Sequence, residues 1–479
     1  MRPSVPPPGR HLRLERLLSP LLLGIAGYIG IQFAIGIIVS RRIRDEDDYL
    51  VAGRSLGPVL TAFTVFATWF GAETCIGAAG AVYEMGLAGG SADPFGYGLC
   101  VILTGIIFAI PLWRLRLTTL ADLFRIRFGH AVERMAVILL VPTSLFWAAA
   151  QVRAFGQVLS SASGLEVELA IGMAALVVIG YTMFGGLLAD AWTDLVQGIA
   201  LLLGLAVLAV MVLRAEGTAP LAALDPGRLD PLGGGELGAL GLLEEWAIPV
   251  VGSLVAAELV ARMVSARSPG VARNATVVAG AAYLMVGLVP VVLGLAGSVL
   301  LPGLEHGEQI LPLLAQEYLP AALYVVFAGA LVSAILSTVD SALLVASSLL
   351  SHNIVVQLRP GLSEKLKVRI ARAGVAILGV CAYLMAVRAD RVYELVEESS
   401  AFGSAGIVIV VAFGLFTRIG GTGSALAALV AGVTTWVLGS HVLDLPYPYL
   451  TALAMAAGSY VTAAALGSSF QGELKPIEA

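Results

Sequence analysis

The sequence predicts an all-α integral membrane protein with about thirteen transmembrane helices. Of its 479 residues, 58% are hydrophobic and 13% are charged, and the mean hydropathy is +0.91. Soluble domains carry about 25% charged residues, so water is not the main solvent of this surface. Apolar runs of about 20 residues, the length that crosses a bilayer, recur along the chain. A single soluble core stops growing near about 250–300 residues, so this long apolar chain without a linker indicates one transmembrane domain, 1–479.

The apolar runs give the expected spans in chain order. They are 17–40, 57–85, 94–113, 135–163, 167–184, 190–213, 241–261, 274–301, 321–350, 373–387, 393–416, 423–440 and 448–468. The first run is too long for the apolar part of a signal peptide and has no small-residue cleavage site, so we expect a retained helix. Only Gly185 and Gly186 separate 167–184 from 190–213.

The distribution of Lys and Arg predicts the orientation of the chain. With the N-terminus outside, 19 Lys and Arg fall in inner segments and 8 in outer ones. Because cytoplasmic loops carry the excess of positive charge, we expect a plasma (inner) membrane protein with its N-terminus outside and its C-terminus in the cytoplasm. The net charge of −5 and the scattered basic residues give no indication of a nucleic-acid partner.

The span 57–85 carries an unusual centre, in which Trp69, Phe70, Gly71 and Glu73 follow one another closely. A glycine between bulky aromatic residues and a carboxylate at mid-span indicates a helix that opens there. Unwound backbone inside a membrane is tolerated where it lines a cavity, and its freed carbonyls can bind a cation. The alternative is that Gly71 only lets two helices approach closely.

The span 321–350 carries a polar stripe. On a helical wheel of 3.6 residues per turn its hydroxyls and one carboxylate fall in one half. These residues are Ser333, Ser337, Thr338, Asp340, Ser341, Ser347 and Ser348. Ala334, Ser337 and Thr338, spaced i, i+3 and i+4, form one patch. Polar residues in spans face the protein interior, and alkali ions prefer hard oxygen donors, so the patch is a candidate sodium site. The alternative is hydroxyls bonded to carbonyls of their own helix.

The segment from Tyr181 to Gly198 combines a Gly-Gly break with two acidic residues. The break is followed by Asp190 and Asp194 at the start of a predicted span. Acidic residues at a helix N-terminus complement its dipole, which accounts for Asp190. Asp194 lies about one turn deeper and is the better candidate for a functional role.

Together these segments resemble the solute:sodium symporter family. The resemblance lies in DDYLVAGRSLGP at Asp47–Pro58, FGGLLADAWTDLVQ at Phe184–Gln197 and SAILSTVDSALLVASS at Ser333–Ser348. FWAAAQVRAFG at Phe146–Gly156 and TWFG at Thr68–Gly71 look most like the choline-transporter branch, with the proline-symporter branch also similar.

The resemblance implies the leucine-transporter fold, in which two inverted five-helix repeats contain broken helices. The repeats would be 57–213 and 241–416, with 17–40 as an extra N-terminal helix and 423–468 as two C-terminal helices. By the same resemblance, one or two sodium ions are the coupling ions. The common site would use carbonyls of Ala67, Phe70 and Ala334 with the hydroxyls of Ser337 and Thr338. Asp194 would serve the sodium exit or a second site, and Asp340 would serve a second sodium or structure only.

The resemblance also places the solute between the second and seventh spans. Trp69 and Trp147 match residues that hold an ammonium group in the choline branch, where cation–π attraction contributes up to about 2 kcal/mol. A third cage position falls at Ala256, so the cage is incomplete. Gly71, Glu73 and Glu258 complete the residues expected at the solute.

Arg153 offers a different interpretation, because a guanidinium can bind a carboxylate with two hydrogen bonds. The expected function is sodium-coupled import of a small polar solute, an amine, a quaternary ammonium compound or an amino-acid-like molecule. The alternatives are a carboxylate or organic-acid symporter using Arg153, and a membrane sensor or channel. Arg153 alternatively pairs with Glu73 or Glu258, or extends toward the interface. No nucleophile, metal or nucleotide pattern indicates an enzyme. We expect the bilayer and a small solute as partners, and a monomer or weak oligomer.

Overall fold

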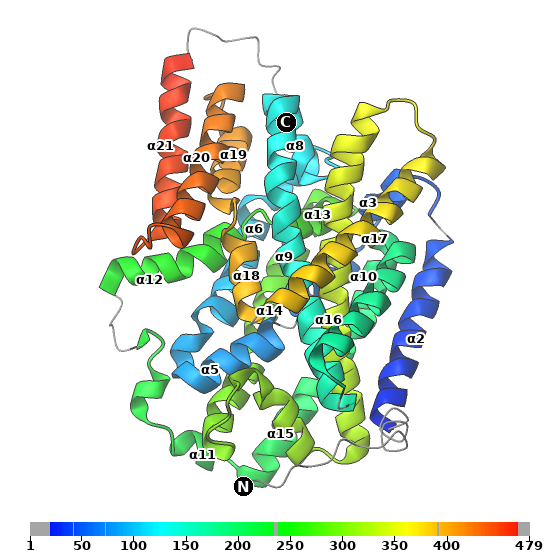
Figure 1. Cartoon of the computed structure of the whole chain (residues 1–479), viewed down its shortest axis with the longest axis vertical. Helices are drawn as coiled ribbons and strands as arrows, with labels where there is room; N and C mark the ends of the chain where they lie inside the picture. Colours follow the sequence, from blue (N-terminus) through cyan, green and yellow to red (C-terminus); the bar gives the residue numbers. More distant parts are fainter. Residues whose placement is uncertain are drawn as a thin grey trace, which may run out of the picture.

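The computed structural model is a helical bundle (Figure 1). It describes residues 20–41, 43–71, 73–163, 165–233, 238–389 and 392–467. Within these ranges the only extended pairing is an isolated bridge between Leu56 and Ala266, and every other regular element is a helix. The all-α prediction is therefore confirmed for the described part of the chain.

The longer helices, in chain order, are α2 (Pro20–Ser40), α4 (Pro58–Trp69), α6 (Tyr97–Ile107), α9 (His130–Ser163), α10 (Val167–Glu216), α12 (Gly238–Ala247), α14 (Pro269–Leu300), α16 (Ala321–Leu350), α17 (Glu364–Arg388), α18 (Val392–Ala401), α19 (Ser404–Phe416), α20 (Thr422–His441) and α21 (Pro448–Leu466). Shorter α-helices are α3 (Glu46–Val51), α5 (Ala79–Met85), α7 (Ala109–Arg114), α8 (Leu120–Phe128), α11 (Ala219–Ala222), α13 (Ala257–Val264) and α15 (Ile310–Tyr318). The π-helical turns are η2 (Glu73–Ala78), η4 (Ser91–Gly96), η7 (Ile248–Gly252) and η9 (Ser351–Val356). The 3₁₀ turns are η1 (Ala52–Arg54), η3 (Gly86–Gly90), η5 (Pro226–Leu229) and η8 (Gly307–Gln309).

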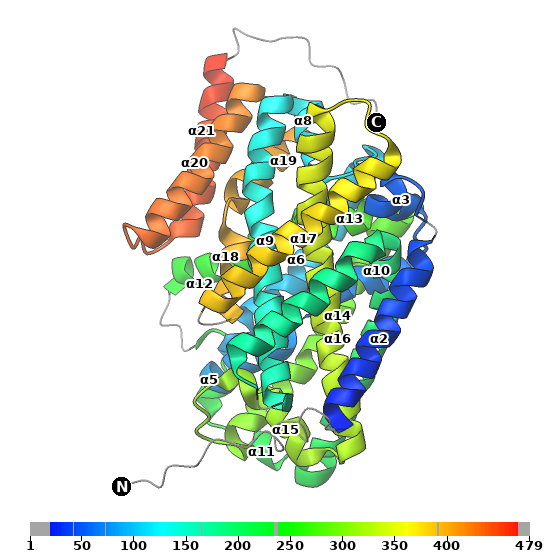
Figure 2. The ribbon, with the colours of Figure 1, turned by 45° about the vertical axis from the view of Figure 1, so that its right-hand side comes forward.

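The helices α9, α10, α16 and α17 pack against one another and form the centre of the bundle. The peripheral helix α2 packs on α10 and α16, whereas α21 packs on α20 and α19. In both views α2 and the pair α20–α21 lie on opposite sides of the bundle (Figure 1, Figure 2). α8 lies near one end of the molecule and α15 near the other (Figure 1). We call these two ends the α8 end and the α15 end.

Ten helical segments in the described residues are long and apolar enough to cross a membrane, and three shorter apolar helices accompany them. The predicted count of thirteen spans stays a prediction. Residues 17–19 of the first expected span and 468 of the last lie outside the described residues. The tenth expected span, 373–387, lies within α17, which begins earlier, at Glu364. Its first turns are rich in Lys and Arg, which shorten an apolar run without ending a helix.

The expected break between 167–184 and 190–213 is present at Gly186. α10 consists of two helices that meet at this residue, whose φ of +62° and ψ of 170° are not helical. A Cβ on Gly186 would lie 2.7 Å from Cδ2 of Tyr49, so the position needs glycine both for its backbone angles and for space.

Three spans are interrupted in mid-course. α4 ends at Trp69 and helical structure resumes at Glu73, so the predicted opening near Gly71 is present. A second interruption separates η7 from α13 at 253–256, and a third separates α18 from α19, where Gly403 adopts φ +71°. The sequence analysis located neither of the last two interruptions.

A polar network joins α8 and η9 at the α8 end. Asn353 of η9 donates to Asp122, and His352 lies 3.5 Å from the same carboxylate. Burial would raise the pKa of Asp122, but hydrogen bonds from His352 and the Thr119 backbone, with the nearby charges of His352 and Arg125, lower this pKa to about 2. The carboxylate therefore stays ionised and holds this end of the bundle together.

Candidate functional site

The first interruption frees a backbone carbonyl in the interior. In a continuous helix the N–H of Gly71 would bind the carbonyl of Ala67. Here the Gly71 N–H instead donates to the carbonyl of Trp69 at 3.1 Å. The Ala67 carbonyl is left without its helical partner and needs another one, because Ala67 is buried.

Two hydroxyls of α16 meet this carbonyl. Ser337 donates to the carbonyl oxygen of Ala67 at 2.8 Å and Thr338 donates to it at 3.2 Å. Both hydroxyls also lie near the carbonyl of Ala334, at 3.3 and 3.2 Å. The structure thus brings together four of the five residues expected at the sodium. Hydrogen bonds from these hydroxyls reach Ala67 and Ala334, and participation of the Phe70 carbonyl stays a prediction.

The hydroxyl stripe of α16 is buried along its whole length, from Ser333 to Ser348. Asp194 of α10 lies next to the patch, since it accepts a hydrogen bond from Thr64 at 2.5 Å and interacts with Ser337. Its Oδ1 atom has no hydrogen-bond partner in the described part of the chain. Carbonyl, hydroxyl and carboxylate oxygens therefore converge halfway along α16, and such hard donors suit an alkali ion.

A buried ion pair lies further toward the α8 end. Arg262 of α13 donates to Asp190 of α10 and to Ser341 of α16, and Arg262 is fully buried. Asp340 interacts with Asp190 as well. Arg262 follows the expected span 241–261 and is one of the 19 Lys and Arg assigned above to inner segments, but it is part of α13 and its side chain is buried in the bundle. Asp340, Asp190 and Arg262 thus form a charged cluster, and a role of Asp340 at a second sodium stays a prediction.

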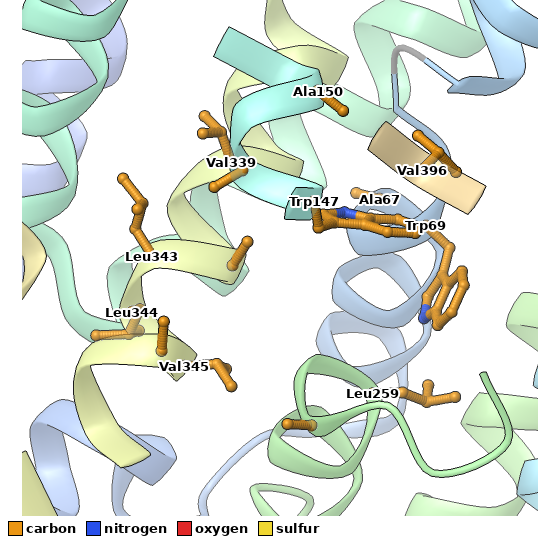
Figure 3. Packing of buried hydrophobic residues seen from close by; sticks show 14 of the residues in the cluster. Ala67, Trp69, Trp147, Ala150, Leu259, Val339, Leu343, Leu344, Val345 and Val396 are labelled. Carbon is orange, nitrogen blue, oxygen red and sulfur yellow. The ribbon is translucent and has the colours of Figure 1, made fainter. Parts of the chain in front are cut away.

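A pocket borders the end of α4, in addition to the hydroxyl patch of α16. Its empty space is ≈ 560 Å³, including the part that opens to solvent. The lining residues come from α4, α9, the second interruption and the α18–α19 region. Figure 3 shows Trp69 and Trp147 next to each other, with Ala67 close by.

Three aromatic rings meet beside this pocket, and two of them, Trp69 and Trp147, line it. The ring centroids of Trp69 and Trp147 are 5.1 Å apart, and Tyr97 of α6 lies 5.4 Å from Trp69 and 6.3 Å from Trp147. The Tyr97 hydroxyl is held by Ser400 at 2.7 Å. Sequence reasoning missed both Tyr97 and Ser400, because no local pattern shows that spans so distant in sequence meet here.

The second interruption supplies a carboxylate to the pocket. Ala256 and Glu258 both line it, and Glu258 accepts a hydrogen bond from Ser144 of α9 at 2.5 Å. Of the ion pairs formed by described residues, none involves Glu258. A carboxylate, aromatic faces and hydroxyls in one pocket form an environment suited to an organic cation.

Two other residues expected at the solute lie elsewhere. Arg153 donates to the carbonyl of Ala386 in α17 at 3.0 Å, and it is not among the residues that line the pocket. Gly71 and Glu73 are buried at the first interruption, outside the pocket lining. The pocket lining therefore gives no support to the expectation that Arg153, Gly71 and Glu73 contact the solute, which stays a prediction.

Comparison with known proteins places this geometry in a family. Residues 49–432 match the model of the sodium:solute symporter family. The chain is 29% identical to the human high affinity choline transporter 1 over 86% of this chain and 73% of the relative. It is 28% identical to the sodium/proline symporter of Salmonella typhimurium over 88% of each chain.

The chain spans just under two thirds of the first two relatives, the high-affinity choline transporters 1 of Drosophila melanogaster (64%) and Caenorhabditis elegans (63%). Among solved structures, a Na⁺-coupled sialic acid symporter in a substrate-bound outward-open state matches with a TM-score of 0.78 at 17% identity, over 94% of this chain and 98% of that one. MhsT, in complex with L-phenylalanine, matches with a TM-score of 0.55 at 12% identity, over 85% and 98%. These likenesses confirm the predicted leucine-transporter fold.

Proposed function

Because the chain belongs to the sodium:solute symporter family, we propose that it is a sodium-coupled symporter that imports a small organic cation by alternating access. The observation that carries this proposal is the position of α4. One side of its broken end faces the hydroxyls of Ser337 and Thr338, and the other side presents Trp69 to the pocket with Glu258. A single interrupted helix thus contacts both the ion patch and the solute pocket.

The sodium ion takes the place between the two hydroxyls and the freed carbonyls. Its ligands are the carbonyls of Ala67, Phe70 and Ala334 and the hydroxyls of Ser337 and Thr338. In the structure these hydroxyls already bond the Ala67 carbonyl, which keeps the oxygens gathered at one place. Asp194, next to Ser337, is the residue that binds sodium first as the ion leaves this site toward the cytoplasm.

The solute places its positively charged ammonium group between the rings of Trp69 and Trp147 and the carboxylate of Glu258, all of which line the pocket. Cation–π contacts contribute about 2 kcal/mol when desolvated. Glu258 faces a membrane-embedded pocket and forms no ion pair with another described residue. Such a carboxylate favours a cation over a neutral or anionic solute. Ala256 lines the pocket at the position expected for a third aromatic residue. Its small side chain leaves room there for a substituent of the solute.

The names of the relatives agree with an ammonium-bearing solute. Choline and proline, which appear in the names of the relatives, both carry a positively charged nitrogen. We place the α8 end in the cytoplasm and the N-terminus outside, in the plasma (inner) membrane, from the excess of Lys and Arg at that end. No observation in the structure favours an organic acid bound by Arg153.

Energetically, one sodium ion suffices for accumulation. A charge crossing about 100 mV supplies about 2.3 kcal/mol, and a tenfold sodium gradient adds about 1.4 kcal/mol. Together these support a solute gradient of several hundredfold.

Uptake into proteoliposomes tests the proposal. An inward sodium gradient should drive saturable uptake of one of a panel of radiolabelled amines, quaternary ammonium compounds and amino acids. Organic acids should not be accumulated. Sodium-independent, unsaturable flux would indicate a channel, and no flux for any member of a broad panel would indicate a sensor. Either result contradicts the proposal.

The sodium patch has its own test. Replacing Ser337 and Thr338 by Ala removes two oxygen ligands, so the sodium concentration for half-maximal uptake should rise at least about tenfold per hydroxyl. Ser347→Ala is the matched control, because its hydroxyl lies on the same helix but donates to Ala371. An unchanged sodium dependence in the double variant rules out this site.

A further inference from the structure

Glu73 is a buried carboxylate that the proposed function leaves unused. It is the first residue of η2, directly after the first interruption, and 4% of it is exposed. Its Oε2 atom accepts a hydrogen bond from Gln151 of α9 at 2.7 Å. Its Oε1 atom has no hydrogen-bond partner in the described part of the chain. Ionisable groups in this position are costly and mark ion or proton pathways.

The charge of Glu73 has no described counter-ion. Of the ion pairs formed by described residues, none includes Glu73. The nearby Asp93 adds a second negative charge. Asp93 differs in that neutral donors satisfy it, with Thr74 at 2.8 Å and Tyr283 at 2.9 Å. Glu73 is thus the carboxylate at this interruption with an oxygen that has no hydrogen-bond partner among the described residues.

Three side-chain oxygens converge beside Gly71. A Cβ on Gly71 would lie 2.5 Å from Oγ1 of Thr338 and 3.0 Å from both Oε1 of Gln151 and Oε2 of Glu73. The glycine therefore leaves open a space that a carboxylate, an amide and a hydroxyl oxygen border together. One formal negative charge and neutral hard oxygens are the donor set that a small alkali ion prefers.

We infer that a second sodium ion binds at the first interruption, held by the Glu73 carboxylate, the Gln151 amide oxygen and the Thr338 hydroxyl. This inference rests on the proposed sodium coupling. Thr338 belongs to both sites, because its hydroxyl also reaches the Ala67 carbonyl. The negative charge of Glu73 offsets the repulsion between two neighbouring ions, so the sites fill cooperatively.

This position is distinct from the acidic cluster on the other side of the patch. There, Arg262 already supplies a positive charge to Asp190 and occupies the space beside Ser341. At Glu73 no guanidinium or ammonium of a described residue forms such a pair. The two ends of the hydroxyl patch therefore differ in how their carboxylates are neutralised, one by a fixed cation and one by an exchangeable ion.

Equilibrium binding of ²²Na⁺ to the purified full-length chain tests the inference. Glu73→Gln keeps the size of the side chain but removes its charge, and we expect it to bind one sodium ion fewer per protein than the parent. The cooperativity of the sodium titration, followed by tryptophan fluorescence at Trp69 and Trp147, should be lost. Glu84→Gln is the matched control, because Glu84 lies in the same span and its carboxylate accepts a hydrogen bond from the backbone N–H of Gly307, away from the first interruption. It should bind as many ions as the parent.

A second variant keeps the test valid if Glu73→Gln does not fold. Gln151→Ala should displace one phase of the sodium titration by about tenfold or more and leave the other phase in place. An equal sodium count in the parent and Glu73→Gln, or two unmoved phases in Gln151→Ala, overturns the second site alone. No sodium bound by the parent protein would overturn the proposed function as well.

Discussion

The first and second interrupted spans share one arrangement, a glutamate after the interruption that is hydrogen-bonded to α9, but their surroundings differ. Each resumes as a helix with a glutamate, Glu73 in the first and Glu258 in the second, and each glutamate accepts a hydrogen bond from α9. The donors, Gln151 and Ser144, are two helical turns apart, with Trp147 between them.

The interruptions differ in what surrounds them. In the first, hydroxyls of α16 bind the freed carbonyl of Ala67, and Glu73 is enclosed. In the second, Thr104 of α6 binds the carbonyl of Leu254 at 2.7 Å, and Glu258 faces the pocket. The first interruption thus suits a bare ion, and the second suits a solute that enters from solvent.

The largest expected effect concerns the ion pair that only the second interrupted span carries. Arg262→Met leaves Asp190 as an uncompensated buried charge, which should cost about 3–5 kcal/mol of unfolding free energy. Unfolding in mixed micelles measures this. Adding Asp190→Asn removes the stranded charge, so the double variant should recover much of the loss. If the unfolding free energy of Arg262→Met were within about 1 kcal/mol of the parent value, packing alone would hold both spans in place.

The next effect separates the two glutamates. Glu258→Gln removes the charge that faces the solute, and uptake of the transported cation should lose about a hundredfold in kcat/KM, or about 2.7 kcal/mol. Ser144→Ala removes the hydrogen bond to Glu258 but keeps its charge, and should cost about tenfold. Equilibrium binding of ²²Na⁺ should be the same in both variants as in the parent. A fall in sodium binding in Glu258→Gln would show that the two interruptions are not separate in purpose.

Much of the ion side of this comparison could be predicted from the sequence, because it depends on local periodicity. α16 has the predicted bounds, 321–350, and its hydroxyl stripe is buried because a helix places i, i+3 and i+4 together. The opening near Gly71 followed from a glycine and a carboxylate inside an apolar run. Both signals lie within one segment of chain.

The solute side could not be predicted in the same way, because contacts between distant spans form it. Tyr97 and Ser400 are joined by a hydrogen bond beside the pocket, and no pattern near either residue indicates this. Arg262 was read as a loop residue, since a charge near the end of an apolar run usually faces solvent. Its burial depends on Asp190 in another span, so only the packed structure reveals it.

The smallest effect tests how the carbonyl of the second interruption is stabilised. Thr104→Val keeps the shape of the side chain but removes the hydroxyl that donates to Leu254. A carbonyl left without a donor should lower the unfolding free energy by about 1 kcal/mol. Because sodium does not compete for this carbonyl, the loss should be the same with and without saturating sodium.

In Ser337→Ala, by contrast, the loss of unfolding free energy should depend on sodium, since the ion and the hydroxyl share the Ala67 carbonyl. If sodium changed the stability loss of Thr104→Val, the second interruption would also bind the ion, and the division between an ion-binding and a solute-binding interruption would fail.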